Sequence, residues 1–480
     1  MKNIFNKPPG FTIKVANAVF VLGILFSVLI TIYAIYRIYH PIYDVNNLRF
    51  YHVSVLFGGL SAALFYLGLR LTDHLKINLS LMLVTATISA YIFETYLEIY
   101  RGPETPKELA EQMGVPYDTR TAMEVLKDLN NSNIKAYPNP LPAYFINSNG
   151  LNSNNGTIYP LGGISNTTTI LSNELGYFPI IETDEHGFNN IKRLYNKKSI
   201  DIILTGDSFA EGLSVHSNET ISAVLREFNF NAISIGKSSN GPFLEYASLV
   251  EYAKPLKPKV VLWLFYINDM VNLKIEMSSS ILRRYLSEDD FSQNLISRQD
   301  EIDSVLLDYV LREWKVELNR EKERKKRIKR EKIANLSVFR VLKLTNFRSM
   351  IRLRPESEPE SVSDQEFEAF KEILKKSRNM VSRWGGKLYF IYLPSYARFS
   401  TGNKNPYRKF VLRTVTELDI PIIDIHGELI ASHPDPLSLF PFRLPGHLTE
   451  EGYRLVAKLI GKRLDADEIV PSNPKFRTPQ

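Results

Sequence analysis

The chain has 480 residues, of which 44% are hydrophobic and 11% aromatic, and this composition excludes a disordered or fibrous protein. It contains no cysteine, which excludes disulfides, thiolate catalysis and cysteine-ligated zinc or iron–sulfur sites. The formal net charge is +7, but residues 320–332 hold nine basic side chains against three glutamates, a surplus of six. The rest of the chain therefore carries only +1, and we predict no binding to nucleic acid.

Three long apolar runs lie within the first hundred residues. Val15–Tyr36, Phe50–Leu71 and Ile77–Phe93 are each about 17 to 22 residues long and nearly free of charge, which is the length of a membrane-crossing helix. Basic residues precede the first run and occupy the link between the second and third. The positive-inside rule then places the N-terminus in the cytoplasm and everything after about Tyr100 outside, either periplasmic or extracellular. We predict a multi-pass anchor over residues 1–101, in contact with membrane lipid.

The remaining chain changes character twice. Residues 102–199 are rich in proline, asparagine, serine and glycine, which favours an irregular extracytoplasmic lead-in region. From residue 200 to 464, short apolar runs of strand length alternate with helical patterns. The expected strands lie at 200–205, 231–235, 260–265, 387–393 and 421–425. This alternation predicts an α/β fold with a parallel five-stranded sheet covered by helices on both faces, and a tail follows at 465–480.

A helical, charged insert interrupts this pattern at about 278–363. Its basic run is either a solvated helix or a surface that rests on anionic lipid headgroups or glycans. Two pieces of the lead-in region, 159–165 and 183–190, are either turns or segments that pack over the catalytic face of the sheet.

Ser208 follows the first expected strand, in Thr-Gly-Asp-Ser. Ligands bind at the carboxyl ends of strands in open parallel sheets, so this serine is either a nucleophile or the N-cap of the next helix. A nucleophilic serine needs a base, most often histidine. His447, in Gly-His-Leu-Thr after the last expected strand, faces the same edge of the sheet.

Four segments resemble, in order, the sequence blocks of the SGNH/GDSL hydrolases. They are Gly206-Asp-Ser208, Ser234-Ile-Gly236 followed by Asn240-Gly-Pro242, Tyr266-Ile-Asn268-Asp269, and Gly446-His-Leu-Thr449 with Gly452. The resemblance covers roughly Ile200 to Leu464 apart from the insert. It implies a three-layer, flavodoxin-like α/β/α domain.

The resemblance also implies roles for individual residues. Ser208 would be the nucleophile and His447 the general base. The amides of Ser208 and Gly236 and the side chain of Asn268 would form the oxyanion hole. No cofactor and no metal are implied.

The sequence departs from the family pattern at two positions. Tyr266 stands where the family usually has glycine, and Leu444 stands where it has the aspartate that orients the histidine. Asp435 and Asp424 are candidates for that carboxylate, and a backbone carbonyl that would leave a Ser-His dyad is a third.

The resemblance implies acyl-ester chemistry on cell-surface carbohydrate. We therefore expect a membrane-anchored serine esterase whose substrate is an acylated glycan or another acyl ester, with O-acetyl as the preferred acyl group. One alternative is an O-acyltransferase in polysaccharide assembly or modification, which would need partner proteins to supply acyl groups. Another is a catalytically inactive protein that binds glycans or assists assembly.

Overall fold

The computed structural model describes residues 10–39, 48–100, 105–197, 199–314, 316, 337–350, 362–400, 405 and 407–469. The chain divides into two compact units, one formed by residues 1–102 with 321–360 and the other by 103–320 with 361–480. The basic run at 320–332 and most of the expected tail at 465–480 lie outside the described residues.

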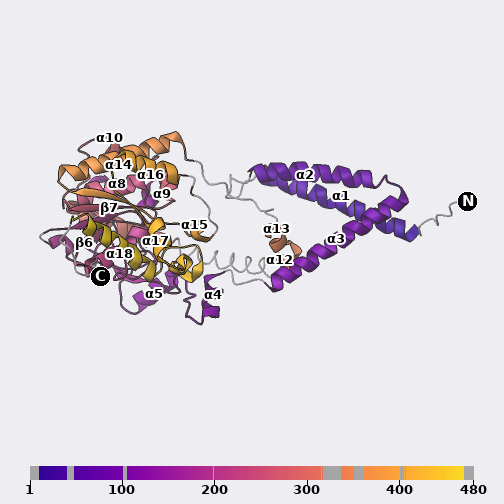
Figure 1. Ribbon diagram of the computed structural model, residues 1–480, viewed down its shortest axis with the longest axis horizontal. Coiled ribbons are helices and arrows are strands. Elements are labelled where there is room, and N and C mark those ends of the chain that lie inside the picture. The colour runs from indigo at the N-terminus through magenta and orange to yellow at the C-terminus, as the bar shows by residue number, and fades with distance from the viewer. Residues whose placement is uncertain are drawn as a thin grey trace, which may run out of the picture. The chain divides into compact units, whose positions relative to one another are not determined.

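The first unit is built on the three apolar runs, each of which forms a helix. These are α1 (Gly10–Tyr39), α2 (Leu48–Gly68) and α3 (Asp73–Ile99), and α1 packs against both of the others (Figure 1). All three are long and apolar enough to cross a membrane. Most of their large apolar side chains are exposed, as expected of helices that face lipid rather than a protein core. The protein is therefore membrane-associated.

The second half of the insert belongs to this same unit. Two short helices, α12 (Ser337–Leu342) and α13 (Thr345–Met350), pack against α3. The buried carboxylate of Glu94 accepts hydrogen bonds from the amides of Asn346 (2.8 Å) and Phe347 (2.7 Å). These amides belong to the first turn of α13, where a helix has no internal acceptor for them. This part of the insert thus returns to the membrane helices.

The second unit contains the predicted parallel sheet. Its strands are β5 (Ile202–Thr205), β6 (Ala232–Ser234), β7 (Val260–Phe265), β8 (Lys387–Tyr392) and β9 (Ile422–Asp424). All pair in parallel in the order β6-β5-β7-β8-β9, which is the flavodoxin-like arrangement. The predicted fold class is confirmed. The strand order reverses beside β5, where ligands bind in folds of this kind.

Helices cover both faces of the sheet (Figure 1). One face carries α8 (Pro242–Ser248), the π-turn η4 (Leu249–Ala253), α9 (Asp269–Glu276), α10 (Ser280–Ser287), α14 (Asp364–Arg383) and α16 (Arg408–Glu417). The other carries α6 (Ser208–Glu211), α7 (Ile221–Glu227), α17 (Ile425–Ser432) and α18 (Glu450–Ala466). Along β7, Val261, Trp263 and Phe265 join the first core and the residues between them the second, because successive side chains of a strand point to opposite faces.

The lead-in region lies in the unit that contains the sheet. Its elements are α4 (Pro106–Met113), α5 (Ala122–Asn131), η2 (Pro142–Phe145), β1 (Leu151–Ser153), β2 (Gly156–Ile158), β3 (Thr168–Ile170), β4 (Ile180–Glu182) and η3 (Leu194–Asn196). The strands form two antiparallel pairs, β1 with β2 and β3 with β4. Helix α15 (Tyr396–Ser400) lies between β8 and α16, and η6 (Pro436–Leu439) and η7 (Pro441–Arg443) lie between α17 and α18. The first half of the insert adds η5 (Leu295–Arg298) and a helix at 299–314.

Candidate active site

Ser208 lies at the carboxyl edge of the sheet, directly after β5. The four residues of β5 are fully buried, and the chain then turns at Gly206 into α6. The N-cap of α6 is Asp207, whose carboxylate accepts the amide of Phe209 at 2.9 Å. The alternative that Ser208 is the helix cap is therefore wrong, because the preceding aspartate fills that role and leaves the serine hydroxyl free for other contacts.

His447 lies near the C-terminal end of the sheet domain, whereas Ser208 lies near its start. It lies between η7 and α18, whose N-cap Thr449 accepts the amide of Gly452 at 3.3 Å. The hydroxyl of Ser208 donates to Nε2 of His447 across 2.6 Å. The imidazole also packs on the ring of Phe209, with centroids 4.7 Å apart. The two predicted residues, 239 positions apart, are thus brought into direct contact.

The far ring nitrogen of His447 contacts a residue that the sequence analysis did not identify. Nδ1 lies 2.7 Å from Oε1 of Glu174, and the backbone amide of His447 donates to Oε2 of the same carboxylate at 2.7 Å. A carboxylate only accepts, so Nδ1 carries the proton and Nε2 is free to accept from Ser208. The result is a Ser-His-Glu chain with the tautomer needed for a general base.

Glu174 lies on a short segment of the lead-in region that crosses this edge of the sheet. The amide of Ser172 donates to the carbonyl of Leu213 at 3.1 Å, and the hydroxyl of Tyr177 donates to Glu450 at 2.7 Å. Leu175 packs against the core beneath. Anchors on both sides of Glu174 therefore fix its position over the loop that carries His447.

The expected position of the orienting acid is corrected by these contacts. Asp435 is engaged elsewhere, because its carboxylate pairs with Arg443 at 2.7 and 3.0 Å. Asp424 pairs with Arg408. The acid that meets His447 precedes the sheet domain by sequence and lies in an irregular segment without periodicity, so no motif marks it.

The three predicted oxyanion donors gather around residues 206–210. The side-chain amide of Asn268 donates to Asp207 at 3.2 Å, which leaves its second N–H available. Gly236 lies so close to this loop that a Cβ there would come within 2.4 Å of Ala210, so only glycine fits. The amide of Ser208, in the first turn of α6, has no acceptor within the helix.

A buried ion pair locks α6 to the Gly236 loop. Nζ of Lys237 lies 2.7 Å from Glu211, and both side chains are almost fully buried. Asn139 bonds to both members of the pair, and Glu211 also accepts the amide of Ser238 at 2.8 Å. Burial alone would raise the pKa of Glu211, but Lys237 outweighs it and the pKa is lowered. The two loops that carry Ser208 and Gly236 are thus held together.

The electrostatics of the histidine follow from its acid partner. Burial lowers the pKa of His447, but the hydrogen bond and charge of Glu174 outweigh burial, so the pKa is raised above its ordinary 6.5. Burial likewise raises the pKa of Glu174, and the contact with His447 reverses this and lowers it. Burial raises the pKa of Asp207 beneath them. At any pH at which the imidazole of His447 is neutral and can act as a base, the carboxylate of Glu174 is therefore ionised.

The two pieces of the lead-in region that the sequence analysis singled out have different neighbours. In piece 183–190, Asn189 donates to the carbonyl of Glu211 and Asn190 to the carbonyl of Ser234, each at 2.8 Å. This piece packs against the ends of α6 and β6, beside the catalytic edge. In piece 159–165, the hydroxyl of Ser165 donates to Asp303 at 2.6 Å, so this piece packs on the insert instead.

The side chains of Ser208, His447 and Glu174 are partly accessible to solvent. Ser208 retains 7% of its surface exposed, and the side chains of His447 and Glu174 retain 17% and 21%. Within the described part of the chain, no cluster of three or more histidine and acidic side chains could hold a metal ion.

The comparisons with known proteins add little to this geometry. No family model matches the chain, and no curated protein matches it. Among solved structures, the chain is similar to the crystal structure of an α/β hydrolase enzyme from the metagenome of Lake Arreo, Spain. The identity is 11% and the TM-score 0.31, over 59% of this chain and 100% of that one. A likeness at this level assigns neither fold nor activity.

Proposed function

We propose that this protein is a membrane-anchored serine esterase of the SGNH type that hydrolyses acyl esters, with O-acetyl groups of cell-surface carbohydrate as the preferred substrate. The observation that carries the proposal is the contact chain from Ser208 through His447 to Glu174 at the carboxyl edge of the sheet. Its hydroxyl, imidazole and carboxylate have the order and the tautomer that nucleophilic catalysis requires.

The reaction proceeds in two halves. Nε2 of His447 takes the proton of Ser208 as its Oγ attacks the ester carbonyl, and the amides of Ser208 and Gly236 with Asn268 stabilise the oxyanion. The imidazolium then protonates the leaving sugar hydroxyl, which gives an acyl-Ser208 intermediate. Water, deprotonated by the same imidazole, attacks this ester, and the imidazolium returns the proton to Oγ of Ser208 as the bond to the acyl carbon breaks and the carboxylic acid is released. Glu174 holds the ring and stabilises its positive charge in both halves.

Labelling with a fluorophosphonate tests the nucleophile directly. We expect the full-length protein in detergent to label, Ser208→Ala to abolish labelling, and Ser382→Ala, on the exposed surface of α14, to leave it unchanged. Labelling that persists in Ser208→Ala, or is absent from the native chain, would overturn the assignment.

A second assay addresses the acceptor. With an O-acetylated polysaccharide, the proposal predicts release of free acetate that depends on Ser208. If an added unacetylated glycan instead received most of the acyl groups, the protein would be a transferase and the hydrolytic part of the proposal would fail.

A further inference from the structure

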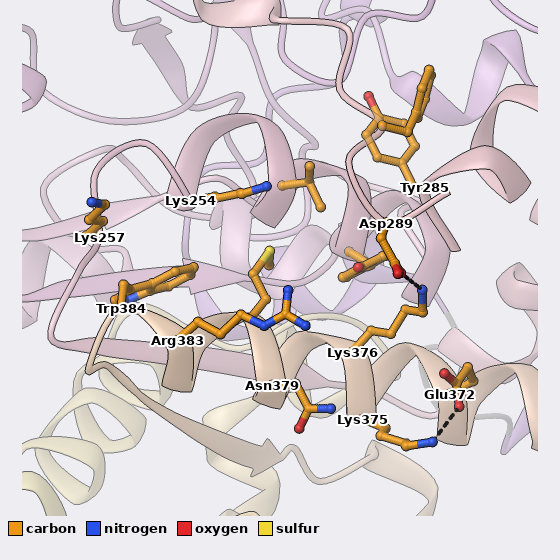
Figure 2. Close-up of a pocket in the computed structure, with 14 residues that line it drawn as sticks. Lys254, Lys257, Tyr285, Asp289, Glu372, Lys375, Lys376, Asn379, Arg383 and Trp384 are labelled. Atoms are coloured by element: carbon orange, nitrogen blue, oxygen red, sulfur yellow. Dashed lines mark hydrogen bonds and ion pairs between the residues drawn. The ribbon is translucent and has the colours of Figure 1, made fainter. Parts of the chain in front are cut away.

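Figure 2 shows a cavity of about 550 Å³. It lies at the edge of the sheet opposite the one that carries Ser208. Its walls come from α8, η4, α10 and α14. Lys257 precedes the start of β7 and Trp384 precedes the start of β8, whereas Ser208 follows the end of β5. Because these strands are parallel, the cavity and the serine lie at opposite edges. Its volume is within the range of about 300–1,000 Å³ that is typical of ligand sites.

The cavity carries an excess of positive charge. Five basic and two acidic side chains line it. Lys376 pairs with Asp289 at 2.7 Å and Lys375 with Glu372 at 3.4 Å, which neutralises two of the cations.

Three cations remain, Lys254, Lys257 and Arg383, and none forms an ion pair with a described residue. Figure 2 shows Lys254 and Arg383 extending into the cavity from opposite walls, with both neutralised pairs at the other end. An anion at the centre would therefore meet unpaired positive charge on two sides.

Aromatic rings in fixed positions form much of the remaining lining. The indole N–H of Trp384 donates to the carbonyl of Pro258 at 2.9 Å, and a Cβ on Gly386 would come within 2.5 Å of that nitrogen, so glycine is required for the ring to lie there. The hydroxyl of Tyr285 donates to Glu251 at 2.6 Å. Tyr246 is also buried, and its hydroxyl bonds to none of the described residues. These rings are preorganised, so binding a ligand against them costs little ordering.

We propose that this cavity binds an acidic segment of a glycan, with the sugar rings against Trp384 and Tyr246 and their anionic groups between Lys254 and Arg383. Lys254, Lys257 and Arg383 are exposed, so a neutral sugar would bind without gaining from their charge, and a small inorganic anion would leave the aromatic walls uncovered. Amphipathic rings with a charged substituent satisfy both features. The binding is separate from the chemistry at Ser208 and does not depend on it. The cavity would hold one part of a polymer at a distance from the catalytic edge.

Calorimetric titration of the full chain in nanodiscs of neutral lipid tests the ligand class. The probes are trigalacturonate, the uncharged maltotriose of the same length, and inorganic sulfate. We expect trigalacturonate to bind at least tenfold more tightly than either of the others, with an affinity that falls as salt is raised. Equal affinity for maltotriose would refute the role of charge, and equal affinity for sulfate would reduce the site to an inorganic anion site.

Two matched variants place the binding in this cavity. The double variant Lys254→Gln with Arg383→Gln should weaken trigalacturonate binding about tenfold. The control, Lys371→Gln with Lys409→Gln, removes the same charge from α14 and α16 outside the cavity and should have little effect. If the control weakened binding as much, the effect would be one of net charge and the site would lie elsewhere.

A third variant tests the rings. Trp384→Ala should weaken trigalacturonate binding several-fold while Trp384→Phe retains most of it, because a ring face is restored. Thermal unfolding midpoints close to that of the native chain would show that each variant is folded. Unchanged binding in Trp384→Ala, with the fold intact, would contradict stacking in this cavity.

Discussion

His447 is held at both of its ring nitrogens, by a hydroxyl at one and a carboxylate at the other. The carboxylate also binds the backbone amide of His447, so the ring and the loop are positioned together. This double contact explains how the chain forms a Ser-His-acid arrangement although Leu444 occupies the usual aspartate position. Glu174, from a distant part of the chain, makes the contact that the resemblance assigns to an aspartate three positions before the histidine.

Replacing Glu174 by glutamine should lower kcat by on the order of 10³- to 10⁴-fold. The amide can donate to Nδ1, which favours the tautomer with the proton on Nε2, and that tautomer cannot accept from Ser208. The measurement is hydrolysis of a soluble acetyl ester by the full chain, compared with Asp435→Asn. Because Asp435 pairs with Arg443 rather than with His447, its variant should stay within about twofold of the native rate. Equal losses in the two variants would remove Glu174 from the assignment.

The pH dependence of the same reaction follows from the charge on His447. The base must be neutral, and Glu174 raises its pKa above 6.5, so kcat should fall as pH drops through a value above 6.5. In Glu174→Gln the largest influence that raises the pKa of His447 is gone, and burial is opposed only by the charges of Asp207 and Glu211, so the acid limb of the residual activity should move to lower pH. An unshifted limb would show that another group titrates.

At the scale of a single element, α8 depends on a buried acid at its start. Glu276, on α9, accepts the amides of Gly241 (2.6 Å) and Phe243 (2.9 Å). Burial raises its pKa to about 8, although these two hydrogen bonds act in the opposite direction. Burial also raises the pKa values of its neighbours Glu245 and Asp269. This layer of the fold therefore contains acids that are more easily ionised in the unfolded chain than in the folded one.

Stability should fall with rising pH because of Glu276. Its folded pKa lies above the unfolded value, so its contribution is complete below about pH 4.5 and is lost as pH rises through about 8, at a cost of up to a few kcal/mol. Thermal unfolding can be followed by the fluorescence of Trp263, Trp314 and Trp384, all in this unit. Between pH 5.5 and 8.5 the native midpoint should drop more than that of Glu276→Gln. Parallel curves would contradict the raised pKa.

At the scale of the whole molecule, one chain forms two units, and the insert contributes to both. Its first half packs on the lead-in region through Ser165 and Asp303, and its described second half packs on α3 through Asn346 and Phe347. The chain therefore passes between the units three times, after residues 102, 320 and 360.

The proposed topology places the link between α2 and α3 in the cytoplasm and the sheet outside. The native chain has no cysteine, so single cysteines report their own side of the membrane without background. In spheroplasts, a membrane-impermeant maleimide should label Ser382→Cys directly and Thr72→Cys only after permeabilisation, since both positions are exposed. The reverse pattern would place the catalytic unit in the cytoplasm and exclude an extracytoplasmic glycan as its substrate.

The sequence by itself determined the elements whose signals are local. Runs of apolar residues specify the three membrane-length helices, and buried strands such as β5 and β7 read as short β-branched runs because both of their faces are covered. Ser208 and His447 could be predicted because each follows a strand at the same edge, where parallel topology brings loop ends together.

Only the tertiary structure decided which acid meets His447. Glu174 lies 273 positions before the histidine, in a segment without periodicity, and its approach depends on the packing of Ser172 and Tyr177 against distant loops. Asp435 is close to His447 in sequence but forms an ion pair with Arg443. The spacing of residues along the chain does not show which of the two side chains Asp435 contacts. The cavity at the opposite edge has the same origin, since Lys254 and Arg383 line one cavity only because β7 and β8 lie side by side. Contacts between segments far apart in the chain are set by packing and not by local pattern.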